Sequence, residues 1–223
     1  MRKLTGAVYQ SLDGVMQGGG APEEDPSGGF RFGGWMVPFS DESMNRATDK
    51  IYIEPEYDLL LGKRTYDIFS AYWPYNQDVP IGAKFQRINK YVLTHSDEPL
   101  TWENSEKVSG DTADAIAELK ESPGRDLLIQ GSSTIYPPLL AAGLIDRLIL
   151  MTFPVVLGEG KRIFDGSQHG TLRLVDHFVS DKGGLFATYE PAGNVRTGSF
   201  VTKEPSEAEL ERREALKLEE ADA

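Results

Sequence analysis

Short apolar runs alternate with amphipathic stretches through the middle of the chain. The runs that predict strands cover residues 3–10, 57–62, 90–94, 126–130 and 146–156. The stretches that predict helices cover residues 40–53, 64–72, 83–89, 111–121 and 133–142, with Ser40 expected to cap the first of them. This alternation predicts a largely parallel sheet that carries helices on both faces.

The remaining segments of the chain follow different patterns. Residues 172–180 and 184–190 predict two more strands joined by the turn 181–184, which form an antiparallel hairpin at the edge of the sheet. Residues 11–34 are rich in glycine and proline and predict a long loop, either a lid, a binding loop or disordered chain. We expect one domain over residues 1–192. Residues 193–223 then form a charged extension, helical or disordered, with Ser206 and Glu209 as a capping box.

Composition narrows the classes of function. The 223 residues carry a formal net charge of −12, which argues against a nucleic-acid or anionic-membrane surface. The chain has no cysteine, which excludes disulfides, thiol catalysis and cysteine metal sites. Its three histidines are not paired as in zinc enzymes, so we predict no metal. We expect a cytoplasmic protein without a membrane span.

Three of the predicted strands end in small, hydroxyl-bearing or basic residues. The segments that cover these strand ends and the residues after them are Gly62-Lys63-Arg64-Thr65, Leu93-Thr94-His95-Ser96 and Gln130-Gly131-Ser132-Ser133-Thr134-Ile135. Each is also common as a plain turn, polar loop or capped connection. Because parallel strands end at one edge of a sheet, the three together favour a site for an anionic cofactor. The glycine motifs of Rossmann folds, P-loops and serine hydrolases are absent.

Four segments resemble a known family. They are residues 11–14 (SLDG), 60–67 (LLGKRTYD), 130–134 (QGSST) and 140–164, the last being the most specific. They are similar to bacterial dihydrofolate-reductase-like proteins related to the reductase domain of the riboflavin-biosynthesis deaminase–reductase. The resemblance covers about residues 2–190. It implies a three-layer α/β/α fold with a mixed, mostly parallel sheet and a C-terminal antiparallel edge hairpin, and NADPH as hydride donor.

The resemblance also implies a cofactor site. Residues 62–65 would hold the pyrophosphate and help with the 2′-phosphate, and residues 131–135 would hold the pyrophosphate from the other side. Residues 94–96 would meet the adenine ribose and its 2′-phosphate, and three further residues would lie near the nicotinamide. The predicted cofactor-binding residues are thus Ala7, Val15, Met16, Gly62, Lys63, Arg64, Thr65, Leu93, Thr94, His95, Ser96, Gln130, Gly131, Ser132, Ser133, Thr134 and Ile135. No acid aligns convincingly with the pterin-binding acid of dihydrofolate reductases, so the substrate stays open.

Candidate chemistry beyond the cofactor is less specific. Asp13 is the candidate catalytic residue, as proton relay or substrate anchor, although Asp-Gly is also a common turn. Met16, Trp35, Phe39 and Phe153 are candidates for an apolar or stacking wall against the substrate, or are plain core or loop residues.

Together these features predict an NADPH-dependent reductase that transfers a hydride to a small planar heterocycle such as a pterin, a pyrimidine or a riboflavin precursor. The alternatives are a non-catalytic NADPH-binding sensor or assembly protein and, more weakly, a phosphoester hydrolase. The apolar strand 148–156 and the edge hairpin predict a homodimer.

Overall fold

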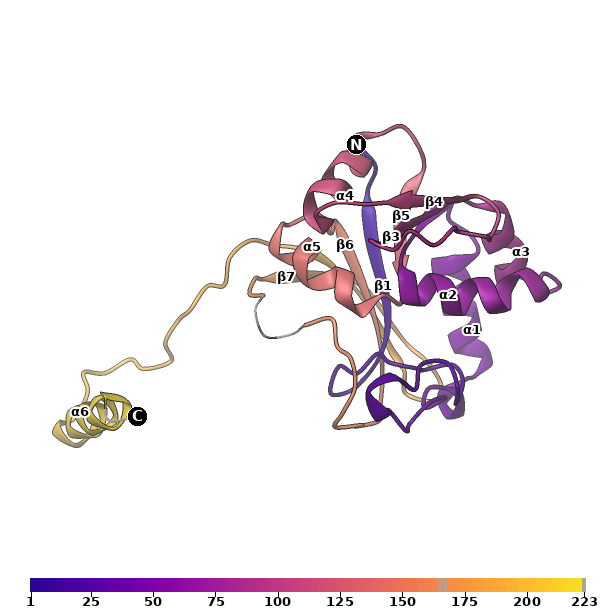
Figure 1. The fold of residues 1–223 in the computed structure, drawn as a ribbon. Helices are drawn as coiled ribbons and strands as arrows, with labels where there is room; N and C mark the ends of the chain where they lie inside the picture. The colour runs from indigo at the N-terminus through magenta and orange to yellow at the C-terminus, as the bar shows by residue number, and fades with distance from the viewer. Residues whose placement is uncertain (165, 167, 222–223) are drawn as a thin grey trace.

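A single mixed sheet forms the centre of the molecule (Figure 1). The computed structural model describes residues 1–164, 166 and 168–221. Its strands are β1 (Leu4–Ser11), β2 (Tyr57–Gly62), β3 (Lys90–Leu93), β4 (Ser105–Val108), β5 (Asp126–Gln130), β6 (Arg147–Phe153), β7 (Leu172–Val179) and β8 (Leu185–Pro191). They lie in the order β4-β3-β2-β5-β1-β6-β8-β7. The pairs from β4 to β6 are parallel, and β8 is antiparallel to both β6 and β7, as predicted.

Helices cover both faces of the sheet. On one face α1 (Glu42–Tyr52), α2 (Lys63–Tyr72) and α3 (Pro80–Arg87) bury Met44, Phe69 and Phe85 in one apolar cluster. On the other face α4 (Thr112–Glu121) and α5 (Tyr136–Ala141) bury Ile116 and Leu139 in a second cluster. The predicted three-layer α/β/α arrangement is therefore confirmed.

Helix starts divide into two kinds. The side chain of Asp41 accepts a hydrogen bond from the backbone N–H of Met44, so Asp41 caps α1 and the expected Ser40 cap is wrong. Asp111 caps α4 in the same way. In contrast, α2 begins after Gly62 with no side-chain cap from the described residues and no acid in its first turn. The first N–H groups of α2 therefore lack an intrahelical acceptor or a capping side chain.

Several predicted boundaries are wrong for identifiable reasons. The helix α3 begins at Pro80 rather than residue 83, because proline fits the first turn of a helix. A 3-10 turn over Ser133–Ile135 precedes α5, which shortens the helix predicted from residue 133. The short strand β4 lies outside every predicted element, since its residues are mainly polar. The strand β6 ends at Phe153, short of the predicted residue 156, and lies inside the sheet, where it supplies no free edge for association.

The C-terminal extension leaves the sheet beside β7 and runs outward to α6 (Glu207–Ala221), which stands apart from the body (Figure 1). The hydroxyl of Ser206 accepts a hydrogen bond from the N–H of Glu209. This is one of the two hydrogen bonds that make up the predicted capping box. Within the described residues, no helix has the length and apolar character needed to cross a membrane.

Candidate functional site

The loops that follow β2 and β5 are bonded directly to each other. The N–H of Gly62 donates to Ser132 Oγ at 2.8 Å, and the N–H of Ser132 donates to Thr65 Oγ1 at 2.9 Å. Gly131 and Ser132 both have positive φ angles, 65° and 60°. A Cβ atom at Gly131 would lie 2.9 Å from Thr65 Cγ2, so only glycine fits between the loops. The sequence pattern grouped these residues correctly, but it did not predict that they bond to one another.

The first turn of α2 carries two basic side chains in different states. Lys63 Nζ lies 2.8 Å from Asp67 and 3.0 Å from Glu98, and these carboxylates raise its pKa. Arg64 is 63% exposed, and its ion pair with Asp25 is longer, at 3.4 Å. Arg64 is therefore the cation that is more available to an external anion.

A cleft of about 420 Å³ opens beside these loops. Eight of the predicted cofactor-binding residues line it: Gly62, Lys63, Arg64, Leu93, Thr94, His95, Thr134 and Ile135. Val108, Gly110 and Thr112, which were not predicted, complete its wall from the β4–α4 connection. The sequence pattern did not indicate these three residues, because the strand β4 that precedes them is short and mainly polar. Ser96 is not among the lining residues; its N–H donates to Thr94 Oγ1 and its carbonyl accepts from Lys107.

Gln130, the last residue of β5, carries a side-chain oxygen, Oε1, that is buried with no hydrogen-bond partner among the described residues. In the sheet Gln130 is paired with Ala7 of β1. Residues alternate between the faces of a strand, and Leu128 belongs to the cluster under α1 and α2, so Gln130 shares that face with Ala7. An unpaired buried acceptor of this kind is costly unless a ligand satisfies it. Because Gln130 is paired with Ala7, a ligand that satisfied this oxygen would lie across the ends of β1 and β5.

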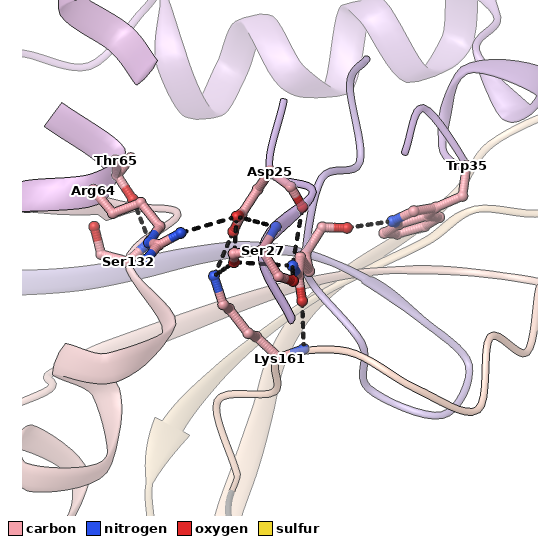
Figure 2. Close-up of polar contacts among 8 residues, drawn as sticks. Asp25, Ser27, Trp35, Arg64, Thr65, Ser132 and Lys161 are labelled. Carbon is pink, nitrogen blue, oxygen red and sulfur yellow. Dashed lines mark hydrogen bonds and ion pairs between the residues drawn. The ribbon is translucent and has the colours of Figure 1, made fainter. Parts of the chain in front are cut away.

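The glycine-rich loop is fixed in place by a polar network (Figure 2). Lys161 Nζ contacts Asp25 Oδ2 at 2.5 Å and Ser27 Oγ at 2.8 Å, and Arg64 reaches the other oxygen of Asp25. Burial pushes the pKa of Asp25 upward, but the hydrogen bonds from Lys161 and Ser27 outweigh it and lower that pKa. Gln17 Nε2 donates to the carbonyls of residues 25 and 27. The network joins the loop to the beginning of α2, and the sequence did not predict it.

Asp13 is held by surrounding donors. Its carboxylate accepts hydrogen bonds from Ser11 Oγ at 2.6 Å and from the N–H groups of Leu157 and Gly158. Arg162 lies 3.0 Å away as an ion-pair partner. The hydrogen bonds from Ser11, Leu157 and Gly158 hold the pKa of Asp13 well below its usual range. In this geometry the ionised carboxylate joins the turn after β1 to the segment after β6.

The three aromatic residues of the predicted apolar wall meet in space, whereas Met16 packs against the cluster on the opposite face of the sheet. The ring centroids of Trp35 and Phe39 each lie 5.9 Å from that of Phe153. Phe153 is fully buried and Trp35 is 8% exposed, which leaves Phe39, half-buried, as the accessible member. Trp35 Nε1 donates to the carbonyl of Gln17, an additional anchor for the loop (Figure 2).

The three residues predicted near the nicotinamide do not all share one environment. Ala7 and Val15 are buried in the cluster under α1 and α2, whereas Met16 packs against the cluster on the opposite face. Ser133, beside the cleft residue Thr134, begins the 3-10 turn before α5. The predicted residues therefore fall into three groups. Some line the cleft, some belong to the loops after β2 and β5, which are interlocked by their hydrogen bonds, and some are buried.

A model of the RibD C-terminal domain matches residues 2–186 of the chain. The chain belongs to the RibD C-terminal domain family. Among curated proteins it is similar to the uncharacterised protein YyaP of Bacillus subtilis strain 168, with 27% identity over 136 residues, 59% of this chain and 72% of YyaP.

Solved structures show the same fold. A protein from Shewanella sp. PV-4 that carries the name riboflavin biosynthesis protein aligns with a TM-score of 0.64 and 20% identity, over 86% of this chain and 99% of that one. Dihydrofolate reductase from Enterococcus faecalis, solved with NADP(H), aligns with a TM-score of 0.53 and 18% identity, over 85% of this chain and 96% of that one. The dihydrofolate-reductase-like fold of this RibD C-terminal domain is therefore confirmed.

Proposed function

We propose that this protein is an NADPH-dependent reductase that acts on a small planar heterocycle. The observation that carries the proposal is the cleft of about 420 Å³. The cleft brings together the beginning of α2, which has no side-chain cap from the described residues, with Arg64 and His95. These two residues follow the adjacent parallel strands β2 and β3. Free backbone N–H groups and an exposed guanidinium are the donors that phosphate groups prefer.

Different residues in the cleft and beside it would bind separate parts of a dinucleotide. Arg64 and His95 would contact the 2′-phosphate, while the amides of α2 and Thr134 would contact the pyrophosphate. Gln130 Oε1, buried beside Ala7 with no partner in the described part of the chain, would accept a hydrogen bond from the nicotinamide end. NADPH supplies the hydride when it is bound. The chain's part is to orient the cofactor and to exclude water.

The substrate side rests on fewer groups. Phe39 is the accessible member of the apolar wall and would stack on a flat ring. Asp13 suits a structural role better than proton transfer, because both of its oxygens already accept hydrogen bonds. It would hold the segment after β6 against the end of β1. We also propose a homodimer, because the outer strand of the hairpin leaves apolar side chains exposed at the edge of the sheet.

Calorimetric titration of the full chain with NADPH, and with NADH in parallel, tests the proposal. We expect tighter binding of NADPH than of NADH, because Arg64 and His95 favour the additional phosphate. Oxidation of NADPH would then be followed with a panel of pterins, pyrimidines and riboflavin precursors. Binding without oxidation of NADPH by any of them would favour the sensor or assembly alternative, and no binding of either nucleotide would contradict the cofactor site.

A further inference from the structure

The outer strand β7 exposes apolar side chains along its whole length. All eight of its residues are exposed. Its apolar members are 38% to 57% accessible: Leu172, Leu174, Val175, Phe178 and Val179. Because β7 is last in the sheet order, its outer row of backbone N–H and C=O groups faces no other strand of the described chain. An exposed apolar edge of this length readily pairs with another extended segment.

The tail of the same chain contains a matching segment. Residues 199–202, Ser-Phe-Val-Thr, lie in the extension between β8 and α6. Phe200 is fully exposed and Val201 is 67% exposed. Aromatic and β-branched residues, including threonine, favour strands. This apolar pair stands out in a tail that is otherwise mainly charged or polar, and a phenyl ring fully in water gains from burial.

The tail begins beside the first residues of β7. The N–H of Ala192 donates to the carbonyl of Thr171 at 2.7 Å, and the N–H of Thr171 donates to the carbonyl of Gly193 at 2.8 Å. Thr171 Oγ1 also donates to the carbonyl of Asn194. Beyond this anchor, the tail turns away from its own β7 and runs outward (Figure 1).

We propose that residues 199–202 of a second copy of this chain pair with the free edge of β7, so that two copies exchange their tails. Each copy would offer one edge and one tail segment, which is the self-complementary arrangement of a two-fold dimer. Phe200 and Val201 would cover the apolar side chains of the partner's outer strand. This inference specifies how the homodimer proposed above would form, and it does not depend on the proposed reductase activity.

The reach of the tail favours a second copy over the chain's own β7. To pair antiparallel with its own β7, the tail would first have to travel the length of that strand, about 26 Å. Residues 195–198 span at most about 14 Å when fully extended. Within one chain only a parallel arrangement is then accessible, and parallel pairing is less stable per residue. A two-fold-related copy can present its tail antiparallel.

Sedimentation velocity of the full chain at micromolar concentration, with hydrogen exchange of the β7 amides, tests the exchange. We expect a dimer with protected β7 amides. Phe200→Glu and a deletion of residues 195–223 should both give monomers in which the β7 amides exchange at least tenfold faster. A deletion of residues 207–223, which removes α6 and keeps residues 199–202, is the matched control and should remain a dimer.

Three results would overturn the proposal. A full chain that is monomeric with unprotected β7 amides excludes the exchange. A monomer whose β7 protection requires Phe200 shows pairing within one chain, and a dimer that survives deletion of residues 195–223 uses another surface. Circular dichroism melting checks that each variant folds. If the deletion does not fold, a peptide of residues 195–206 added in excess to the Phe200→Glu protein should restore protection of β7, and no protection would contradict the proposal.

Discussion

The two edges of the sheet differ in length, in chemistry and in what they leave exposed. At one edge β4 has four residues, of which Ser105, Glu106 and Lys107 are polar or charged. Its last residue accepts the N–H of Thr94 and lines the cleft. At the other edge β7 has eight exposed residues that are mainly apolar. Short charged edges resist further pairing, whereas long apolar edges attract it. The cleft side is therefore completed within one chain, whereas the hairpin side keeps an exposed apolar edge.

On the cleft side, Gly131→Val should be the most damaging change. The substitution combines a positive φ with a Cβ atom 2.9 Å from Thr65, so it should separate the two interlocked loops. We expect a loss of about 2–3 kcal/mol in the free energy of unfolding, measured in urea, together with loss of NADPH binding in calorimetry.

Gly143→Val is the matched control for that change. Gly143 has the same φ of 65°, but a Cβ atom there would have no described atom within 4 Å apart from its own chain neighbours, and the residue is outside the cleft lining. It should lose stability through backbone strain and keep its affinity for NADPH. Equal loss of NADPH affinity in both variants would contradict the role of the interlock in binding.

Arg64→Glu should rank second. Arg64 is the less neutralised cation of the cleft, and a charge-assisted hydrogen bond contributes about 1.5–3 kcal/mol. We expect NADPH affinity to fall about 10- to 100-fold as a result, while NADH affinity changes much less. Arg46→Glu is the control, since Arg46 is equally exposed at 63% but lies on α1 outside that cleft. An equal loss for both nucleotides would remove the basis for 2′-phosphate recognition.

Lys161→Met tests the glycine-rich loop. The change leaves Asp25, 12% exposed, without its closest cation. We expect the unfolding free energy to fall by about 1–2 kcal/mol, and cleavage within residues 17–34 by a Glu-specific protease to accelerate. Lys182→Met on the hairpin side removes one hydrogen bond to the carbonyl of Pro38 and should leave the cleavage rate unchanged. An unchanged rate in both variants would show that the network does not hold the loop.

The alternation of apolar runs and helix signals predicted most of the sheet, because those strands are buried on both faces. The same pattern gives no signal for β4, whose polar residues pair only at an edge and bury little apolar surface. It grouped the residues of the cleft, since strand ends converge in a parallel sheet. It could not predict that Asp25 and Lys161, 136 residues apart, would meet, because that contact depends on the path of an irregular loop. Nor could it separate Phe39 from Phe153, whose burial is a property of packing.

Asp41→Asn should have the mildest effect, and it probes the attachment of the hairpin to α1. Asp41 accepts hydrogen bonds from Ser43 Oγ, from the N–H of Met44 and from the N–H of Lys182 in the β7–β8 turn. The hydrogen bonds from Ser43 and Met44 lower its pKa from the usual 3.8 to about 2. A lowered carboxyl pKa means that the ionised group stabilises the fold above its unfolded-state pKa, and that this contribution is lost as the pH falls through the folded-state value.

Asp41→Asn should therefore melt below the wild type at pH 6, and the difference should close as the pH approaches 2. Thermal unfolding followed by circular dichroism from pH 2 to pH 7 measures both. Asp111→Asn is the control, because Asp111 caps α4 through the N–H groups of Ala113 and Asp114, far along the chain from the hairpin turn. If hydrogen exchange in residues 181–184 rises only in Asp41→Asn, the carboxylate joins the hairpin to the body. If it rises in neither variant, the turn is held by its own hydrogen bonds, such as that from Gly184 to Ser180, and Asp41 acts on α1 alone.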